Sequence, residues 1–187
     1  MAQKWRVPSF SPSNRAKKPP PPLTDAKLRD LALHYVGRFA TTRAKLTAYL
    51  SRKIRERGWD DAQPPDLQAL AEQFAELGYI DDASFAAMKG AALTRRGFGT
   101  RRVGETLRAA GVEEEDSAPA LDDAAAERWA SADAFARRKR LGPYAAAPVE
   151  RDKRDKHIAA FLRAGHDYAM ARRWIDAAPG EMPEREE

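Results

Sequence analysis

Apolar residues recur every three or four positions from Thr24 to about residue 177, a spacing that places them on one face of an α-helix. Ser, Thr or Asp residues precede many of these runs, and Gly or Pro residues follow them, as they do at helix ends. No stretch alternates with a period of two, so we expect an all-α protein without a β-sheet.

The same end signals predict nine helices. Their expected starts are, in chain order, Thr24 or Asp25, Thr41 or Thr42, Asp66, Asp81 or Asp82, Gly99-Thr100 and Glu113, followed by helices over about 121–140, 149–164 and 167–177. The glycines expected to close the earlier helices are Gly58, Gly78, Gly97 and Gly111.

The middle helices share a pattern that indicates a repeat. Val103 and Leu107 stand four residues apart, and Gly111 follows after another four. Similar apolar stripes end at Gly58 and Gly165, at an irregular spacing of roughly 50–55 residues. Each unit is too small to bury its stripe alone, so we expect the units to stack into an elongated, curved array. The predicted units are three tandem three-helix repeats, similar to helix-turn-helix units, over 24–80, 81–120 and 121–178.

The two ends of the chain lack this pattern. Residues 1–23 hold five basic residues, no acidic residue and four consecutive prolines, so we expect a disordered, basic, Pro-rich tail. This tail is either a solvated leader or a weak contact for nucleic acid or a partner. Residues 179–187 are expected to form a disordered C-terminal tail.

The net charge of +5 is modest, so it argues only weakly for a polyanionic partner. The charge is also uneven along the chain, since residues 113–130 hold seven acidic residues and one basic residue.

Composition and motifs exclude several classes of protein. The chain has no Cys, which excludes disulfides and thiolate chemistry and agrees with a cytoplasmic location. No apolar run approaches the roughly 18 residues of a membrane span, and no apolar core follows the basic N-terminus, so we expect neither a membrane segment nor a secretory signal. His34, His157 and His166 lack the spacing of metal ligands, and no Gly-rich phosphate loop or nucleophile motif is present. We therefore expect a protein that is not an enzyme and needs no metal or other cofactor.

A junction motif runs from Gly78 to Phe85. Gly78 ends one helix, Tyr79 packs at the junction, and Asp81 and Asp82 cap the next helix and complement its dipole. The two carboxylates could instead belong to a metal or acid–base site, but no His or third carboxylate is close in sequence. Capping is therefore the favoured interpretation.

Basic residues gather in clusters that could contact a partner. The candidate binding residues are Arg95, Arg96, Arg101, Arg102, Arg108, Arg137, Arg138, Lys139, Arg140, Lys153 and Arg154. Gly97 and Gly99 would let the backbone approach a partner closely. Arg101 and Arg102 lie in the first turn of a predicted helix, where the dipole disfavours cations, so the pair suggests an anionic partner carrying phosphate or carboxylate. The alternative is a solvated charged face.

Two segments of the chain resemble the RecX family of RecA recombinase modulators. One is Tyr79-Ile80-Asp81-Asp82-Ala83-Ser84-Phe85-Ala86, which is similar to a Gly-Tyr-Leu-Asp-Asp-x-x-Phe-Ala-like segment between the family's first two repeats. The other is the pattern of basic residues, glycines, helix, Leu and Gly formed by Arg95, Arg96, Gly97, Gly99, Arg101, Arg102, Leu107 and Gly111. The resemblance extends from about Leu28 to Ile175. The chain departs from the family in the Pro64-Pro65 loop and in an interruption over 142–148.

The resemblance implies a curved, all-α regulator in the groove of the RecA–single-stranded-DNA filament. There it would hinder filament extension, ATP hydrolysis and strand exchange, and restrain recombination and the SOS response. The implied partners are the RecA filament and single- or double-stranded DNA bound without base specificity, and we expect the protein to be a monomer. Acidic residues 113–116 would face basic protein surface, and the Arg clusters would face phosphate or acidic protein surface. Two alternatives remain, a stand-alone non-sequence-specific DNA-binding protein and a helical scaffold for another protein.

Overall fold

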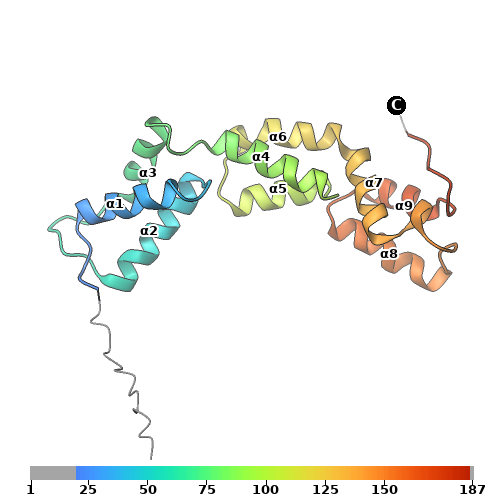
Figure 1. Cartoon of the computed structure of the whole chain (residues 1–187), viewed down its shortest axis with the longest axis horizontal. Helices are drawn as coiled ribbons and strands as arrows, with labels where there is room; N and C mark the ends of the chain where they lie inside the picture. Colours follow the sequence, from blue (N-terminus) through green and yellow to red (C-terminus); the bar gives the residue numbers. More distant parts are fainter. Residues whose placement is uncertain (1–19, 186–187) are drawn as a thin grey trace, which may run out of the picture.

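The computed structural model describes residues 20–185 and is helical throughout that range (Figure 1). Its elements are α1 (Asp25–Val36), α2 (Arg43–Arg57), α3 (Leu67–Glu76), α4 (Asp82–Arg95), α5 (Thr100–Ala109), α6 (Glu114–Ala126), α7 (Arg128–Lys139), the 3₁₀ turn η1 (Gly142–Tyr144), α8 (Arg151–Arg163) and α9 (Tyr168–Asp176). Between residues 20 and 185 the β-structure amounts to one isolated bridge, from Leu23 to Trp59. The prediction of an all-α fold is confirmed. None of these helices is long and apolar enough to cross a membrane.

Local capping signals explain where the first four helices begin. Thr24, Thr42, Asp66 and Asp81 are the N-cap residues of α1 to α4. In each case a side-chain oxygen accepts a hydrogen bond from the backbone N–H three residues further on. A cap of this kind stabilises a helix by about 1 kcal/mol. Where the sequence left two candidates, the structure selects Thr24, Thr42 and Asp81.

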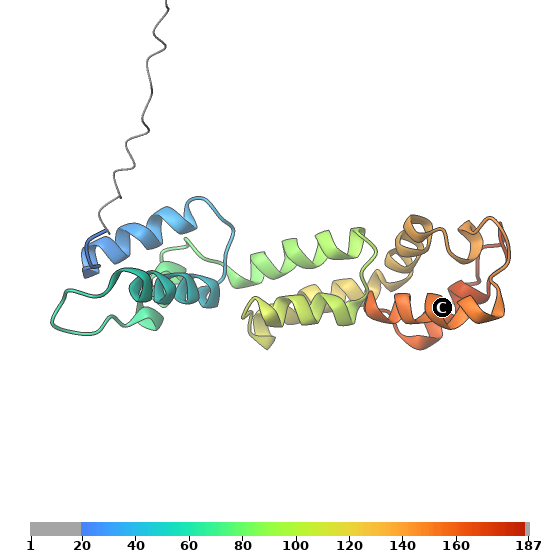
Figure 2. The same ribbon diagram turned by 90° about the horizontal axis from the view of Figure 1, so that it is seen from below.

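The helices form three groups, each around its own cluster of buried apolar residues. The first unit packs α1, α2 and α3 around Leu23, Leu28, Leu46, Leu50, Leu70 and Phe74. The second unit packs α4, α5 and α6 around Phe85, Leu93, Val103, Leu107, Ala120 and Ala124. The third unit packs α7, α8 and α9 around Phe135, Ile158, Phe161, Trp174 and Ile175. Figures 1 and 2 show the three units following one another along an elongated molecule.

The single helix predicted over 121–140 is wrong. α6 ends at Ala126 and α7 begins at Arg128, so the chain changes direction at Glu127. Ala120 and Ala124 pack in the second core, whereas Phe135 packs in the third. The expected unit boundary at residue 120 therefore lies within α6. No Gly or Pro occurs between residues 120 and 130 to mark the break.

The predicted N-terminal tail extends too far along the chain. Leu23 is fully buried in the first core. Its backbone N–H donates to the Gly58 carbonyl at 3.0 Å, and its carbonyl accepts from the Asp60 N–H at 2.9 Å. Apolar burial and these two hydrogen bonds fix the chain at Leu23. Residues 1–19 lie outside the described residues, so the tail prediction stays untested there.

The segment that follows α9 is not helical, and part of it is attached to the third unit. The Gly180 N–H donates to the carbonyl of Pro143, within η1, at 2.8 Å. Residues 186–187 lie outside the described residues.

Candidate functional site

The first and second units meet at the N-terminus of α2. Thr42, which is fully buried, caps α2 and also donates from its hydroxyl to the Ala110 carbonyl at 2.6 Å. Gly111 follows with φ 72°, and a Cβ at this position would overlap the Cβ of Ala44. Glycine at position 111 therefore allows both the backbone turn after α5 and the close approach of α2. We call this contact the first joint.

One guanidinium connects three helices across the first joint. Arg43 Nε lies 3.2 Å from Asp82 Oδ2, Nη1 lies 3.3 Å from Glu72 Oε2, and Nη2 lies 2.8 Å from Asp116 Oδ2. Partial burial alone would lower the pKa of Arg43, but the hydrogen bonds to Asp82 and Glu72 outweigh it and raise the pKa. The cation therefore stays charged and holds α2, α3, α4 and α6 together.

The two aspartates of the junction motif have different roles. Asp81 caps α4, accepting from the Ser84 N–H at 2.8 Å, as expected. The prediction that Asp82 also caps α4 is wrong. Its buried carboxylate accepts from the backbone N–H of Arg43 at 3.1 Å as well as from the guanidinium, so it binds a backbone N–H in the first turn of α2, the helix that Thr42 caps. The cause is the fold, which brings the start of α2 against the start of α4.

The other members of the junction motif have structural contacts. Gly78 adopts φ 74° after α3. The Tyr79 ring lies 5.6 Å from the Phe74 ring, and Phe85 is buried beneath Lys45, whose Nζ lies 4.4 Å from the ring centroid. Burial lowers the pKa of Lys45, and the nearby charge of Lys89 lowers it further. Among the described residues no group of three or more His, Asp or Glu could hold a metal ion at this motif or elsewhere.

The second and third units meet through backbone atoms, at a contact we call the second joint. The Gly99 N–H donates to the Ala164 carbonyl at 2.9 Å, and a Cβ on Gly99 would overlap the backbone of Gly165. A Cβ on Gly97 would come within 2.6 Å of the Phe135 backbone nitrogen. The two glycines do permit close approach, as predicted, but the segment that approaches is this chain's own third unit and not a separate partner.

A buried histidine completes the second joint. His166 is 5% exposed, its Nε2 lies 3.2 Å from the Gly97 carbonyl, and its ring packs against those of Phe135 and Phe161. Burial lowers the pKa of His166, and the hydrogen bond to Gly97 opposes that effect. Burial between the two units therefore favours the neutral form of the ring.

Arg101 and Arg102 lie in the first turn of α5, as predicted, but this chain supplies their anionic partners. Arg101 Nη1 lies 2.7 Å from Glu105 Oε1, and Arg102 Nη1 lies 3.3 Å from Glu105 Oε2. Arg101 also donates to the Leu162 carbonyl in the last turn of α8. Cations are favoured at that negative helix end, which offsets their unfavourable position at the start of α5.

Five exposed cations gather where α4 and α7 end. Arg138 donates to the Arg96 carbonyl, which brings the two helix ends together. Both guanidinium carbons lie 5.5 Å from the centroid of the Phe98 ring. We call the exposed set at these two helix ends the basic edge; it comprises Arg95, Arg96, Arg138, Lys139 and Arg140. Two of the predicted clusters are thereby joined into one surface.

Ion pairs account for three of the four remaining candidates. Arg137 lies 3.0 Å from Asp133, and its hydrogen bond to Tyr144 raises its pKa. Lys153 lies 2.6 Å from Glu150, which raises its pKa. Arg154 bonds Asp176 through two nitrogens at 2.7 Å each, joining α8 to α9.

Arg108 remains exposed on α5, with no ion pair among residues 20–185. Arg95, Lys139 and Arg140 are likewise without an ion pair in that range. The structure thus separates cations that pair within the chain from cations that have no ion pair among the described residues.

Sequence reasoning did not identify Arg43 or Phe98, and it treated His166 only as a possible metal ligand. Arg43 directly follows a cap residue, but its carboxylate partners lie 29, 39 and 73 positions away. No local spacing reports such contacts. A Phe between two glycines and beside two arginines was the one local signal for Phe98.

Comparison with known proteins places the chain among bacterial regulators. No family model matches it. It is 33% identical to the regulatory protein RecX of Myxococcus xanthus over 88% of this chain and 92% of that protein. It is 27% identical to the regulatory protein RecX of Agrobacterium fabrum over 76% of this chain and 78% of that protein. Among solved structures, RecX from Lactobacillus salivarius matches with a TM-score of 0.55 at 18% identity, over 78% of this chain and 90% of that one, and supports the fold.

Proposed function

Because the chain belongs to the RecX family of regulatory proteins, we propose that it binds the RecA–single-stranded-DNA filament and restrains its activity. In this proposal the bound protein hinders filament extension, ATP hydrolysis and strand exchange. It acts as a monomer in the cytoplasm, where recombination and the SOS response take place. Its role is regulatory, without a reaction of its own.

The observation that carries the proposal is the basic edge. Arg95, Lys139 and Arg140 are exposed and have no ion pair within residues 20–185. Arg96 and Arg138 lie over Phe98, which keeps their guanidinium groups together. Exposed cations gathered in one place fit a surface of phosphates or carboxylates, such as a nucleoprotein filament presents.

The elongated shape supports binding to several filament subunits at once. Contacts made by the three units would then add through high effective concentration, even where each contact is weak. In this arrangement the acidic start of α6, with Glu113, Glu114 and Glu115 exposed, faces basic protein surface while the basic edge faces phosphate or acidic protein surface. Charge reversals of Glu115 and Arg95, alone and together, test this assignment, and unchanged filament affinity in all of them would contradict it.

The second candidate function is binding to DNA without a recombinase. The same basic edge favours it, since exposed cations bind phosphate without base specificity. This alternative requires strong affinity for free DNA that falls steeply with salt. The filament proposal requires that the protein act at ratios well below one molecule per recombinase subunit.

The deciding experiment is ATP hydrolysis by the cognate RecA on single-stranded DNA, titrated with the wild-type protein and two variants. Arg95→Glu/Lys139→Glu alters the basic edge, and Lys27→Glu/Lys89→Glu makes the same charge change at exposed positions elsewhere. Each phosphate contact contributes about fivefold to affinity between 1 M and 0.1 M salt, so losing two should raise the half-maximal concentration about 25-fold. The control should stay near wild type. Undiminished hydrolysis with the folded wild-type protein at equimolar ratio would refute the proposal.

A further inference from the structure

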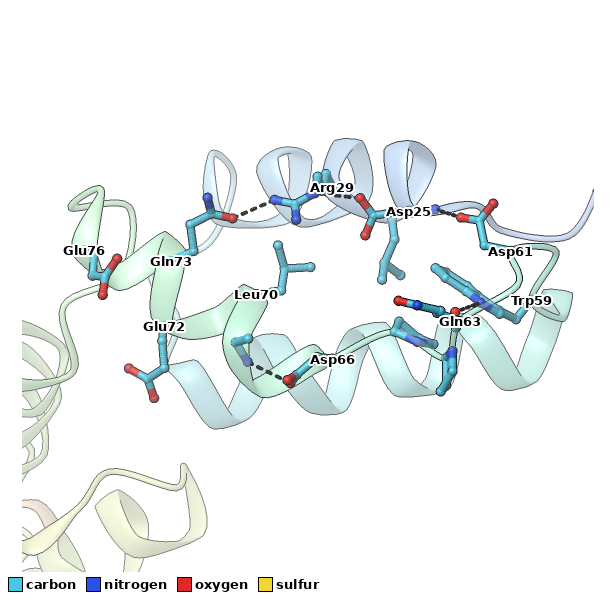
Figure 3. A pocket seen from close by; sticks show the side chains of 14 residues that line it. Asp25, Arg29, Trp59, Asp61, Gln63, Asp66, Leu70, Glu72, Gln73 and Glu76 are labelled. Atoms are coloured by element: carbon cyan, nitrogen blue, oxygen red, sulfur yellow. Dashed lines mark hydrogen bonds and ion pairs between the residues drawn. The ribbon is translucent and has the colours of Figure 1, made fainter.

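The first unit contains a groove of about 690 Å³ between α1, α3 and the loop that joins α2 to α3 (Figure 3). Leu28, Leu70 and Trp59 line it, together with Pro64 and Pro65 of the loop. Trp59 is held by a hydrogen bond from its indole N–H to the Gln63 carbonyl at 2.7 Å. Leu28 and Leu70 are buried, so the accessible apolar surface of the groove comes from Trp59 and the two prolines.

The rim of this groove is acidic. Its charged lining residues are the carboxylates Asp25, Asp61, Asp66, Glu72 and Glu76 and the single cation Arg29. Arg29 is already occupied, by Asp25 at 2.8 Å and by Gln73 at 2.6 Å. Glu76 is exposed and has no ion pair in the part of the chain that the structure describes. The groove thus fits a segment that is both basic and partly apolar.

The chain itself enters the fold at this rim. Arg57 donates from two nitrogens to the Pro21 carbonyl, at 3.0 and 2.8 Å, and Leu23 is bridged to Trp59. Trp59 and Asp61, which come two and four residues after Arg57, line the groove. Whatever precedes Pro20 is therefore attached within reach of it.

The preceding residues have the matching chemistry. Residues 1–19 carry five cations, no carboxylate and two large aromatic side chains, Trp5 and Phe10. A 19-residue segment can extend up to about 60 Å, whereas a helix of the length of α1 is about 18 Å long. The segment can thus turn back along the whole groove.

We propose that residues 1–19 dock in the acidic groove of their own first unit. Their cations lie along the carboxylate rim, and an aromatic side chain covers the apolar floor beside Trp59. Attachment at Pro20 gives the segment an effective concentration on the order of millimolar, so weak contacts suffice. This inference does not depend on the proposed regulatory function.

The test is paramagnetic relaxation in the full-length protein. The chain has no Cys, so Ser13→Cys supplies the one attachment site for a nitroxide. We expect amide signals of groove residues such as Ala69 and Gln73 to broaden at least twofold more than that of Lys89 in the second unit. Equal broadening at Lys89, or none in the groove, would overturn the proposal.

Two further measurements separate the alternatives. Glu76→Lys should reduce the groove broadening about twofold or more, whereas Glu115→Lys, which changes the same charge on the exposed face of α6, should leave it unchanged. Unlabelled ¹⁵N protein mixed with spin-labelled ¹⁴N protein should show no broadening. Broadening in that mixture would mean that a second copy supplies the segment, which contradicts docking within one chain.

Discussion

Replacing Arg43 by Met should weaken the first joint more than any other single loss of charge in the first unit. The substitution removes the guanidinium and keeps the aliphatic volume. The Asp82 side chain, 2% exposed, is then left with the backbone N–H of Arg43 as its remaining donor in the described chain. Removing one partner of a buried pair costs about 3–5 kcal/mol.

The expected cost lies near the lower end of that range. The Arg43 side chain is 26% exposed, so solvent screens part of the interaction. The other two carboxylates, on Glu72 and Asp116, are 43% and 28% exposed, and such pairs contribute about 1 kcal/mol or less each. We therefore expect the free energy of unfolding to fall by about 3 kcal/mol, or about 6–12 °C in Tm if the described helices unfold together.

Urea and thermal unfolding, followed by circular dichroism, measure this loss, and hydrogen exchange locates it at the N-terminus of α2. Arg55→Met is the matched control, because Arg55 is exposed on the same helix and has no ion pair in the described chain. A double-mutant cycle with Asp82→Asn should show a coupling of at least about 1.5 kcal/mol. The reasoning would be refuted if Arg43→Met and Arg55→Met agreed within about 0.5 kcal/mol.

Three other outcomes follow from the two joints and the N-terminal anchor. Gly99→Ala should lower the free energy of urea unfolding by about 1–3 kcal/mol, because a Cβ would overlap the backbone of Gly165 at the second joint. The control, Gly104→Ala in the middle of α5, should not destabilise the protein. Burial holds the pKa of His166 below its ordinary value of 6.5, so the contribution of His166 to stability is complete above pH 6.5 and declines as the pH falls towards the folded-state pKa. His166→Gln should therefore flatten the dependence of the free energy of unfolding on pH between pH 7 and pH 5. An unchanged slope in the variant would count against this role. Leu23→Ala should lower the free energy of chemical unfolding by about 2–5 kcal/mol, whereas no effect would be expected if Leu23 belonged to a disordered tail.

The sequence predicts those parts of the fold that depend on local chemistry. Helices are recognised because their apolar stripes and caps, such as Thr42 and Asp66, lie within a few residues of one another. The break between α6 and α7 at Glu127 cannot be recognised in this way, because no local signal marks it. Ala can face either neighbouring core, and no helix-breaking residue stands between α6 and α7. Two helices with compatible spacing therefore look like one.

The candidate site was harder to predict because charge alone does not reveal which cations are already paired. Arg101 and Arg154 stand in basic clusters that resemble the basic edge in sequence. Their partners, the end of α8 and Asp176, lie 61 and 22 residues away. Arg95 and Lys139, at the ends of α4 and α7, have no ion pair in the described chain. That distinction arises from tertiary structure.

The two joints hold the units together by different chemistry, and this difference has a consequence for the proposed binding to a filament. A body that contacts several subunits at once gains affinity only if its units keep a fixed spacing. The second joint achieves this with backbone atoms, Gly99 against Ala164, which leaves little freedom. The first joint relies on side chains, with Arg43 as its centre, and side chains can rearrange. If the protein binds a filament as proposed, we expect it to adjust between the first and second units and to keep the second and third units, which carry the basic edge, at a fixed spacing.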